Sequence, residues 1–159
     1  MRPVTNRLQD EIKQTRPFRS LEEEVLLGIA RTADVLQRGF AELLKTAGLT
    51  NTQYNVLRIL RGAGAAGLSC SEVTSRMITR DPDMTRMLDR LEARQLVMRA
   101  RDAADRRIVT SRITEDGLAL LASLDGPMEA HHSKVLGPLG PEKLRALASL
   151  LDEARAASG

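Results

Sequence analysis

The segment 81–93 combines arginine, threonine and aspartate in a spacing that could present them together to the edges of nucleic-acid bases. Asp81-Pro82 is typical of a helix start, because aspartate caps the first turn and proline, which lacks an N–H, fits the first helical position. Apolar residues follow at the i, i+3, i+4 and i+7 positions of one face, namely Met84, Met87, Leu88 and Leu91. The outward face then carries Asp83, Thr85, Arg86, Asp89 and Arg90.

Thr85 and Arg86 are the predicted base readers on this helix. An arginine can donate two hydrogen bonds to O6 and N7 of guanine, and a threonine offers a hydroxyl and a methyl group to a base edge. Asp83, Asp89 and Arg90 could instead orient those side chains. The methionines of the inward face are interpreted as core rather than as ligands.

Two strand-like runs, 96–101 and 108–113, flank a charged stretch and predict a β-hairpin. Arg106 and Arg107 at its tip could enter the narrow, electronegative minor groove of DNA. Asp105 could hold a guanidinium group there by a charge-assisted hydrogen bond. Taken alone, these charges are better explained as a solvated turn. The elements that precede the hairpin instead favour contact with DNA.

Those preceding elements are two helices that begin with capping boxes, Thr50 with Gln53 and Ser69 with Glu72. The second is short and ends near Met77. Helix, turn, helix and hairpin in this order predict a winged helix-turn-helix between about residues 50 and 114. Its candidate DNA-binding residues are Ser69, Ser71, Asp83, Thr85, Arg86, Arg90, Asp105, Arg106 and Arg107.

The rest of the chain predicts further helices on either side of this lobe. A capping box of Ser20 and Glu23 opens a long helix that ends at Gly48, and Thr114 caps another that Gly126-Pro127 could kink or interrupt. A last helix opens at Pro141, while residues 1–19 form an arm or a short helix. We therefore expect a mainly α fold with a small β-wing and six main helices, in a single domain over 20–159.

Composition and charge agree with this organisation. Hydrophobic residues make up 42% of the 159 residues and aromatic residues only 2%, which predicts a core of aliphatic side chains. Between Ser69 and Thr114 there are ten arginines and no lysine against seven acidic residues, whereas the remainder has fourteen of each sign. A local basic surface suits contact with phosphates, although charge alone is equally compatible with a solvated surface.

The sequence also argues against several other classes of protein. The single cysteine, Cys70, excludes an intramolecular disulfide and a multi-cysteine metal site, and is typical of a reducing compartment. No apolar run of about 18 residues predicts a membrane span, and the N-terminus lacks the pattern of a signal peptide. We therefore expect a cytoplasmic protein without a cofactor.

In its motifs the chain resembles the MarR (multiple antibiotic resistance regulator) family of bacterial transcriptional regulators. The resemblance runs from about Leu21 to the C-terminus, and its most specific parts are residues 49–57, 85–92 and 105–107, followed by Ile113-Thr114. It implies a homodimer in which helices at 20–48 and 115–157 interleave with those of the partner. It further implies repression from a pseudo-palindromic operator in double-stranded DNA, with release by a small organic effector, often phenolic or anionic, bound between the dimerisation and DNA-binding lobes.

Two features depart from the family pattern. Gln95 stands where a glycine usually follows the recognition helix, so a left-handed conformation there would cost about 1 kcal/mol. The only aromatic residues are Phe18, Phe40 and Tyr54, so few side chains are available to stack against a phenolic ligand.

Single features of the sequence are also compatible with functions other than DNA binding. Cys70 could be a redox sensor, because a thiol near a helix start is acidified, but a small packed cysteine is the simpler interpretation. His131 and His132 point about 100° apart on a helix and are interpreted as surface or interface residues rather than as a zinc site. No catalytic motif is present, so no enzyme is expected. A winged helix used only for protein contact is the main alternative, and the basic wing argues against it.

Overall fold

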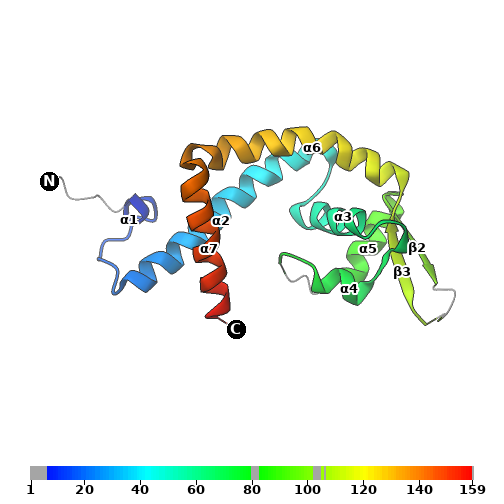
Figure 1. Ribbon diagram of the computed structural model, residues 1–159, viewed down its shortest axis with the longest axis horizontal. Helices are drawn as coiled ribbons and strands as arrows, with labels where there is room; N and C mark the ends of the chain where they lie inside the picture. The colour runs from blue at the N-terminus through cyan, green and yellow to red at the C-terminus, as the bar shows by residue number, and fades with distance from the viewer. Residues whose placement is uncertain (1–6, 80–82, 102–104, 106, 159) are drawn as a thin grey trace.

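The computed structural model describes residues 7–79, 83–101, 105 and 107–158 and is mainly helical with one small sheet (Figure 1). Its helices are α1 (Arg7–Glu11), α2 (Leu21–Leu44), α3 (Asn51–Ala63), α4 (Cys70–Ser75), α5 (Met84–Ala93), α6 (Glu115–Leu136) and α7 (Gly140–Ala156). Short 3₁₀ turns follow three of them, η1 (Lys45–Ala47), η2 (Gly64–Ala66) and η3 (Gly137–Leu139). The strands are β1 (Leu68–Ser69), β2 (Val97–Arg101) and β3 (Val109–Ile113). The predicted fold class is confirmed, with the five-residue α1 added to the six main helices.

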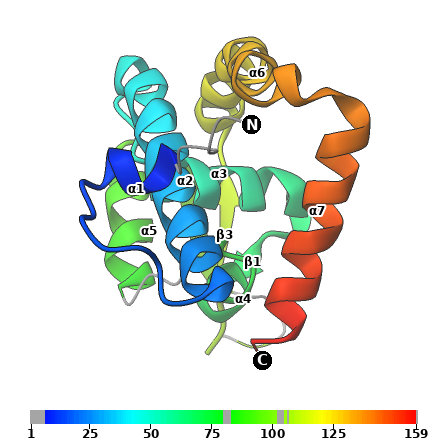
Figure 2. The same ribbon diagram turned by 90° about the vertical axis from the view of Figure 1, so that its left-hand side faces the viewer.

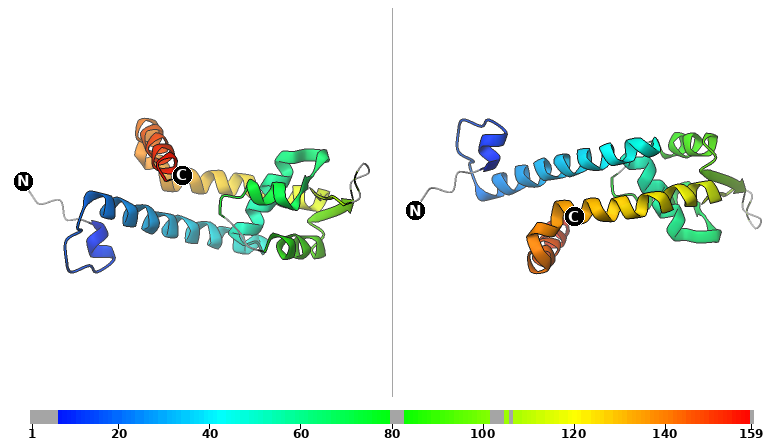
Figure 3. Two further views of the ribbon diagram at one scale, coloured as in Figure 1. Left: turned by 90° about the horizontal axis from the view of Figure 1, so that it is seen from below. Right: turned by 90° about the horizontal axis from the view of Figure 1, so that it is seen from above.

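The long helices α2 and α6 extend in the same direction away from a lobe formed by α3, α4, α5 and the sheet (Figures 1 and 3). Helix α1 lies at the far end of α2, and α7 runs from the far end of α6 across the direction of that helix (Figures 1 and 2). Figure 2 shows α7 well separated from α2. Both helices consequently expose large apolar side chains, with Leu21 71%, Leu26 68% and Leu150 61% accessible.

The predicted helix starts are confirmed at three places. Thr50 and Gln53 form a reciprocal capping box on α3, and Ser69 and Glu72 form another on α4. The Thr114 side chain accepts the N–H of Gly117 at the start of α6. These caps satisfy N–H groups that the first helical turn leaves without an internal partner.

Two expectations about helix starts need correction, and the question left open at Gly126-Pro127 is answered. Ser20 caps α2 as predicted, because its hydroxyl accepts the N–H of Glu23, but the Glu23 carboxylate accepts the N–H of Arg19 at 2.6 Å rather than that of Ser20, so the box is not reciprocal. Helix α5 begins at Met84 and not at Pro82, because the carboxylate of Asp83 accepts the N–H of Arg86 and caps it. Residues 81 and 82 lie outside the described residues. Helix α6 continues through Gly126 and Pro127 without interruption.

The sheet is antiparallel in the order β1-β3-β2. The predicted hairpin pairs Val97 with Ile113 and Arg101 with Val109, while the two-residue β1 pairs with the other edge of β3 and was not predicted. Ser111 of the central strand β3 pairs with Leu68 of β1 and Arg99 of β2 and is 1% exposed.

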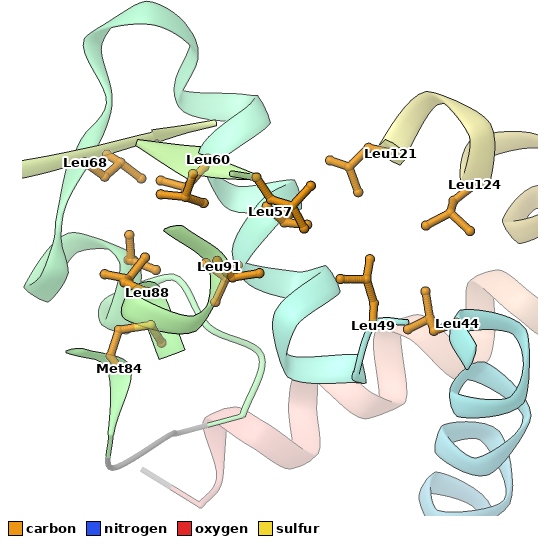
Figure 4. Close-up of a cluster of buried hydrophobic side chains, with 14 of the residues drawn as sticks. Leu44, Leu49, Leu57, Leu60, Leu68, Met84, Leu88, Leu91, Leu121 and Leu124 are labelled. Atoms are coloured by element: carbon orange, nitrogen blue, oxygen red, sulfur yellow. The ribbon is translucent and has the colours of Figure 1, made fainter. Parts of the chain in front are cut away.

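The core is aliphatic, as the composition predicts. It connects the lobe to the C-terminal end of α2 and to the N-terminal half of α6 (Figure 4). The side chains of Leu57 and Leu60 on α3 face those of Leu88 and Leu91 on α5. Leu44, at the end of α2, continues the same cluster and is 0% exposed. Leu121 and Leu124 of α6 also join it. Helices α3 and α5 are therefore fixed to each other and to the start of α6 by buried leucines.

Candidate nucleic-acid interface

Helix α5 separates an apolar face from a polar one, as predicted. Met84, Leu88 and Leu91 are buried at 4%, 1% and 0% exposure, and Met87 packs partly against the same core. The opposite face is exposed and carries Thr85, Arg86, Asp89 and Arg90. A helix with this distribution can lie in a DNA major groove with its polar side chains toward the bases.

Arg86 is oriented by the residue that caps its helix. The Asp83 carboxylate accepts the backbone N–H of Arg86 at 3.2 Å, and its other oxygen lies 3.3 Å from the Arg86 Nε. The Arg86 side chain remains 76% exposed, so its outer N–H groups can still bind a base. The proposed orienting role of Asp83 therefore has a direct geometric basis.

Helix α4 presents its N-terminal end beside α5. The Thr85 hydroxyl lies 3.9 Å from the Cys70 sulfur, so the two helices meet at this point. The Ser69 hydroxyl donates to Glu72 Oε2 at 2.8 Å and accepts the Glu72 N–H. Both its donor and its acceptor are therefore used in the cap of α4. The Ser69 backbone N–H also donates to Glu72 Oε2 at 2.8 Å, and this bond, together with that from the hydroxyl, holds the pKa of Glu72 below its usual value. Ser71 is exposed one position beyond Cys70.

Arg99 on β2 binds the wing to α5. Its Nη2 lies 2.5 Å from Asp89 Oδ1 and 2.7 Å from Glu92 Oε2, and its Nε lies 2.9 Å from the same glutamate oxygen. Hydrogen bonding to Glu92 raises the pKa of Arg99. Asp89 is therefore engaged with the wing in the DNA-free protein.

The wing tip is organised by Asp105. Its carboxylate accepts the backbone N–H of Arg107 at 3.0 Å, and its carbonyl accepts the N–H of Ile108. Arg107 is exposed. Arg106, the other predicted minor-groove residue, lies outside the described residues. The predicted guanidinium contact of Asp105 remains a prediction.

The turn that follows α5 adopts the conformation that a glycine would favour. Gln95 has φ +59°, and the N–H of Leu96 bonds the Leu91 carbonyl across the turn. The Thr114 hydroxyl donates to the Gln95 carbonyl at 2.6 Å. Arg94 also fixes this end of α5, because its guanidinium donates to the carbonyls of Ala47 and Gly48. The left-handed turn is thus retained despite the glutamine.

A cavity of about 490 Å³ lies between the DNA-binding lobe and the long helices. Phe40 of α2, Met128 of α6 and Ile78 contribute apolar wall, and Asn51 and Asn55 of α3 contribute amides. The Asn55 Oδ1 accepts the N–H of Ile78 at 3.2 Å and so fixes the segment that leads from α4 toward α5. The cavity therefore adjoins a contact that positions the exposed helix.

The candidate redox and metal-binding residues, Cys70, His131 and His132, lie in ordinary packing environments. Cys70 is half-buried. His131 and His132 both pack against the Phe40 ring, with centroid separations of 5.1 and 5.3 Å. Among the described residues there is no group of three metal-binding side chains, and no helix long and apolar enough to cross a bilayer.

Arg94, Arg99 and Asn55 position the site and were not predicted from the sequence. The pair of acidic residues Asp89 and Glu92, one turn apart on a helix that precedes a strand, is a signal that could have indicated a cation on that strand. Arg94 and Asn55 bind backbone groups distant in sequence, and no local pattern indicates such contacts.

An exposed polar helix, its supporting helix and a basic two-stranded wing define this molecule as a winged helix-turn-helix DNA-binding transcriptional regulator. The sequence profile described as the MarR family matches residues 49–109. The crystal structure of a MarR transcription factor from Planctomyces limnophilus is 35% identical, covers 86% of this chain and 98% of its own, and superposes with a TM-score of 0.66. The chain belongs to the MarR family.

Two further relatives share this similarity. The transcriptional repressor MdtR of Bacillus subtilis (strain 168) is 30% identical over 97 residues, which is 61% of each protein. The structure of Bordetella bronchiseptica BpsR, described with regulation of DNA binding by 6-hydroxynicotinic acid, is 28% identical with a TM-score of 0.74 and covers 84% of this chain and 99% of its own. The relatives are transcriptional regulators, not enzymes.

Proposed function

We propose that the protein is a homodimeric repressor that binds a pseudo-palindromic operator through residues 50–114 of each subunit. The observation that carries this proposal is the exposed face of α5, on which Asp83 holds Arg86 at the helix start. Thr85 and Arg86 are the proposed base-reading residues, and Arg90 is proposed to bind DNA beside them or to orient them. Ser71, Arg106 and Arg107 are proposed to bind the DNA backbone or minor groove, and Ser69 and Asp105 to shape those contacts.

The unpartnered apolar side chains at the other end of the molecule support dimerisation. Leu21, Val25, Leu26 and Ile29 are 42–71% exposed on one stretch of α2, and Leu147 and Leu150 are 39% and 61% exposed on α7. Large apolar surface of this kind is typical of an interface between subunits. We therefore assign the helices within 20–48 and 115–157 to dimerisation, with the two α5 helices placed roughly 34 Å apart to reach adjacent major grooves.

Repression is favoured over activation by the similarity to MdtR, which is named a repressor. A dimer that covers a promoter can exclude the polymerase by occupancy alone, without catalysis. Because a bacterial operator lies in the cytoplasm, this function also places the protein there.

The cavity between the lobes supports control by a small molecule. Its volume of about 490 Å³ lies within the range of about 300–1,000 Å³ for small-molecule sites. Asn55 and Ile78, whose hydrogen bond fixes the segment before α5, both line it. A ligand there would bind one arrangement of the DNA-binding lobe better than another and shift the protein away from the operator. BpsR, with its 6-hydroxynicotinic acid, is a relative in which such regulation is described.

The test is binding to duplex from the protein's own upstream promoter region against a scrambled duplex, at two salt concentrations. We expect sequence-preferring binding that weakens steeply with salt, and a dimer by sedimentation. Equal weak binding to both duplexes would refute specific recognition of this promoter. Salt-insensitive capture of a protein without DNA binding would support the alternative, a winged helix used for protein contact.

A further inference from the structure

Arg94, directly after α5, binds the C-terminal end of α2. Its Nη1 donates to the Gly48 carbonyl at 2.7 Å and its Nη2 to the Ala47 carbonyl at 3.2 Å, which lie 46 and 47 positions earlier in the chain. The turn that ends this helix is closed by its own backbone, since the Leu49 N–H donates to the Leu44 carbonyl at 3.1 Å. The last carbonyls of a helix carry partial negative charge, so a guanidinium with two donors suits this position.

The start of α6 contacts the same turn. The Thr114 N–H donates to the Leu96 carbonyl at 3.1 Å, and its hydroxyl donates to the Gln95 carbonyl at 2.6 Å. A Cβ atom on Gly117, in the first turn of α6, would lie 2.4 Å from the Leu96 carbonyl oxygen, so glycine is needed for this close approach. The turn 94–96 therefore joins the recognition helix to both long helices.

The two contacts differ in the groups that make them. The contact with α6 uses backbone carbonyls and close packing, whereas the hydrogen bonds to the end of α2 come from the side chain of Arg94. Arg94 is exposed, so its replacement removes these bonds while Leu44, Leu49 and Leu91 stay packed in the buried cluster (Figure 4). Apolar packing has little directional preference, but two hydrogen bonds to neighbouring carbonyls favour one orientation. Arg94 thus constrains the angle between α5 and the end of α2.

We propose that Arg94 is a positioning residue that, through this angle, fixes the spacing of operator half-sites that the dimer accepts. The inference rests on the proposed function, in which α2 and α6 hold the dimer together and α5 reads DNA. The distance between the two α5 helices then depends on the angle at each junction with the dimerisation helices, and that distance selects the half-site spacing. Arg94 lies about 12 Å along the helix axis from Arg86, away from the base-reading end. It should therefore affect the spacing and not the base sequence of each half-site.

Selection of duplexes from a library with a random central segment tests this assignment with the full-length protein. The wild type should enrich paired half-sites at one spacing. Arg94→Met, which keeps the aliphatic stem and removes the donors, should enrich the same half-sites at several spacings. Arg16→Ala removes a positive charge outside the proposed interfaces and should behave as the wild type.

Fluorescence anisotropy then compares the selected duplex with one lengthened by a base pair between the half-sites. This insertion moves the half-sites about 3.4 Å further apart and turns them by about 34°. We expect it to lower affinity at least about tenfold in the wild type and about threefold or less in Arg94→Met. Arg94→Ala supplies the same comparison if Arg94→Met does not fold.

The outcomes separate the role of Arg94 from the proposed function. If the wild type enriched no paired half-sites, the pseudo-palindromic operator and the role of Arg94 would both be refuted. If it did, and Arg94→Met kept the full loss on insertion, the role of Arg94 alone would be refuted, even where its affinity fell equally for both duplexes. A changed half-site sequence would make Arg94 a base-reading contact instead, and an equally small loss in Arg16→Ala would assign the effect to charge.

Discussion

The guanidinium of Arg99 on β2 donates two hydrogen bonds to one carboxylate oxygen of Glu92 on α5. Its Nε and Nη2 lie 2.9 and 2.7 Å from Oε2. The backbone N–H of Arg99 donates to the second oxygen, Oε1, at 3.1 Å. Both residues are only partly exposed, at 26% and 37%, so the pair is stronger than a fully solvated one. It makes the wing and the recognition helix one unit.

Replacing Arg99 with alanine should lower both stability and operator affinity. The carboxylates of Glu92 and Asp89 would lose their shared cation, and we expect the free energy of unfolding to fall by about 1–2 kcal/mol. Chemical denaturation measures this loss. The exposed Arg101 on the same strand provides the control, since Arg101→Ala should leave stability unchanged; equal losses in the two variants would contradict the role of the contact.

Arg86→Ala should reduce discrimination between operator and scrambled duplex by about 1–3 kcal/mol, the usual contribution of a bidentate contact to a base. Fluorescence anisotropy with both duplexes measures the difference. Arg16→Ala, at an exposed arginine outside the proposed dimerisation and DNA-binding segments, is the matched control for loss of one positive charge. If the two variants discriminated equally well, Arg86 would not be a base reader.

Arg107→Ala should weaken binding to all duplexes by a similar factor, because a wing arginine contacts phosphate or the minor groove rather than a unique base pattern. The plot of log affinity against log salt concentration should become shallower by about 0.9, the value expected for one lost phosphate contact. A loss confined to the operator would instead indicate a base-specific contact.

Gln95→Gly should stabilise the protein by about 0.5–1 kcal/mol. Gln95 has φ +59°, a conformation that glycine adopts without steric cost. Its hydrogen bond from Thr114 uses the backbone carbonyl and survives the change. Thermal unfolding measures the gain, and Gln95→Ala, which keeps a Cβ, should show none; a gain in both variants would point to the side chain instead.

Glu72→Gln should make stability less dependent on acid pH. Hydrogen bonds from Ser69 lower the pKa of Glu72 in the folded protein, so its stabilising effect is present above the unfolded-state pKa and is lost as the pH falls through the folded value. A glutamine oxygen can still accept the N–H of Ser69, but it does not titrate. Denaturation at pH 7 and at about pH 3 compares the two proteins, and an unchanged difference would exclude this contribution.

Much of the fold follows from local sequence signals. The capping boxes at Thr50 and Ser69, and the inward spacing of Met84, Leu88 and Leu91, each depend on residues within one or two turns. Such signals are strong because capping and helical periodicity act locally. The start of α5 was misplaced because Asp81 and Asp83 are both suitable caps, and the local pattern does not choose between them.

The parts that could not be predicted depend on contacts between distant segments. The strand β1 has only two residues and forms because Leu68 pairs with Ser111, far along the chain. The same holds for Asn51, whose amide binds α2 across 14 positions. Such pairings are set by packing, which one sequence does not display.

Helix α6 is long enough to act as a lever arm between α7 and the wing. It starts where Thr114 bonds the carbonyls of Gln95 and Leu96, and its 22 residues span about 33 Å before the chain turns into α7. A pivot of 3° at the distant end would swing the wing by about 1.7 Å over that length. A shift of that size exceeds half the donor–acceptor distance of a hydrogen bond, so we expect substitutions near α7 to affect the fit of the wing to an operator.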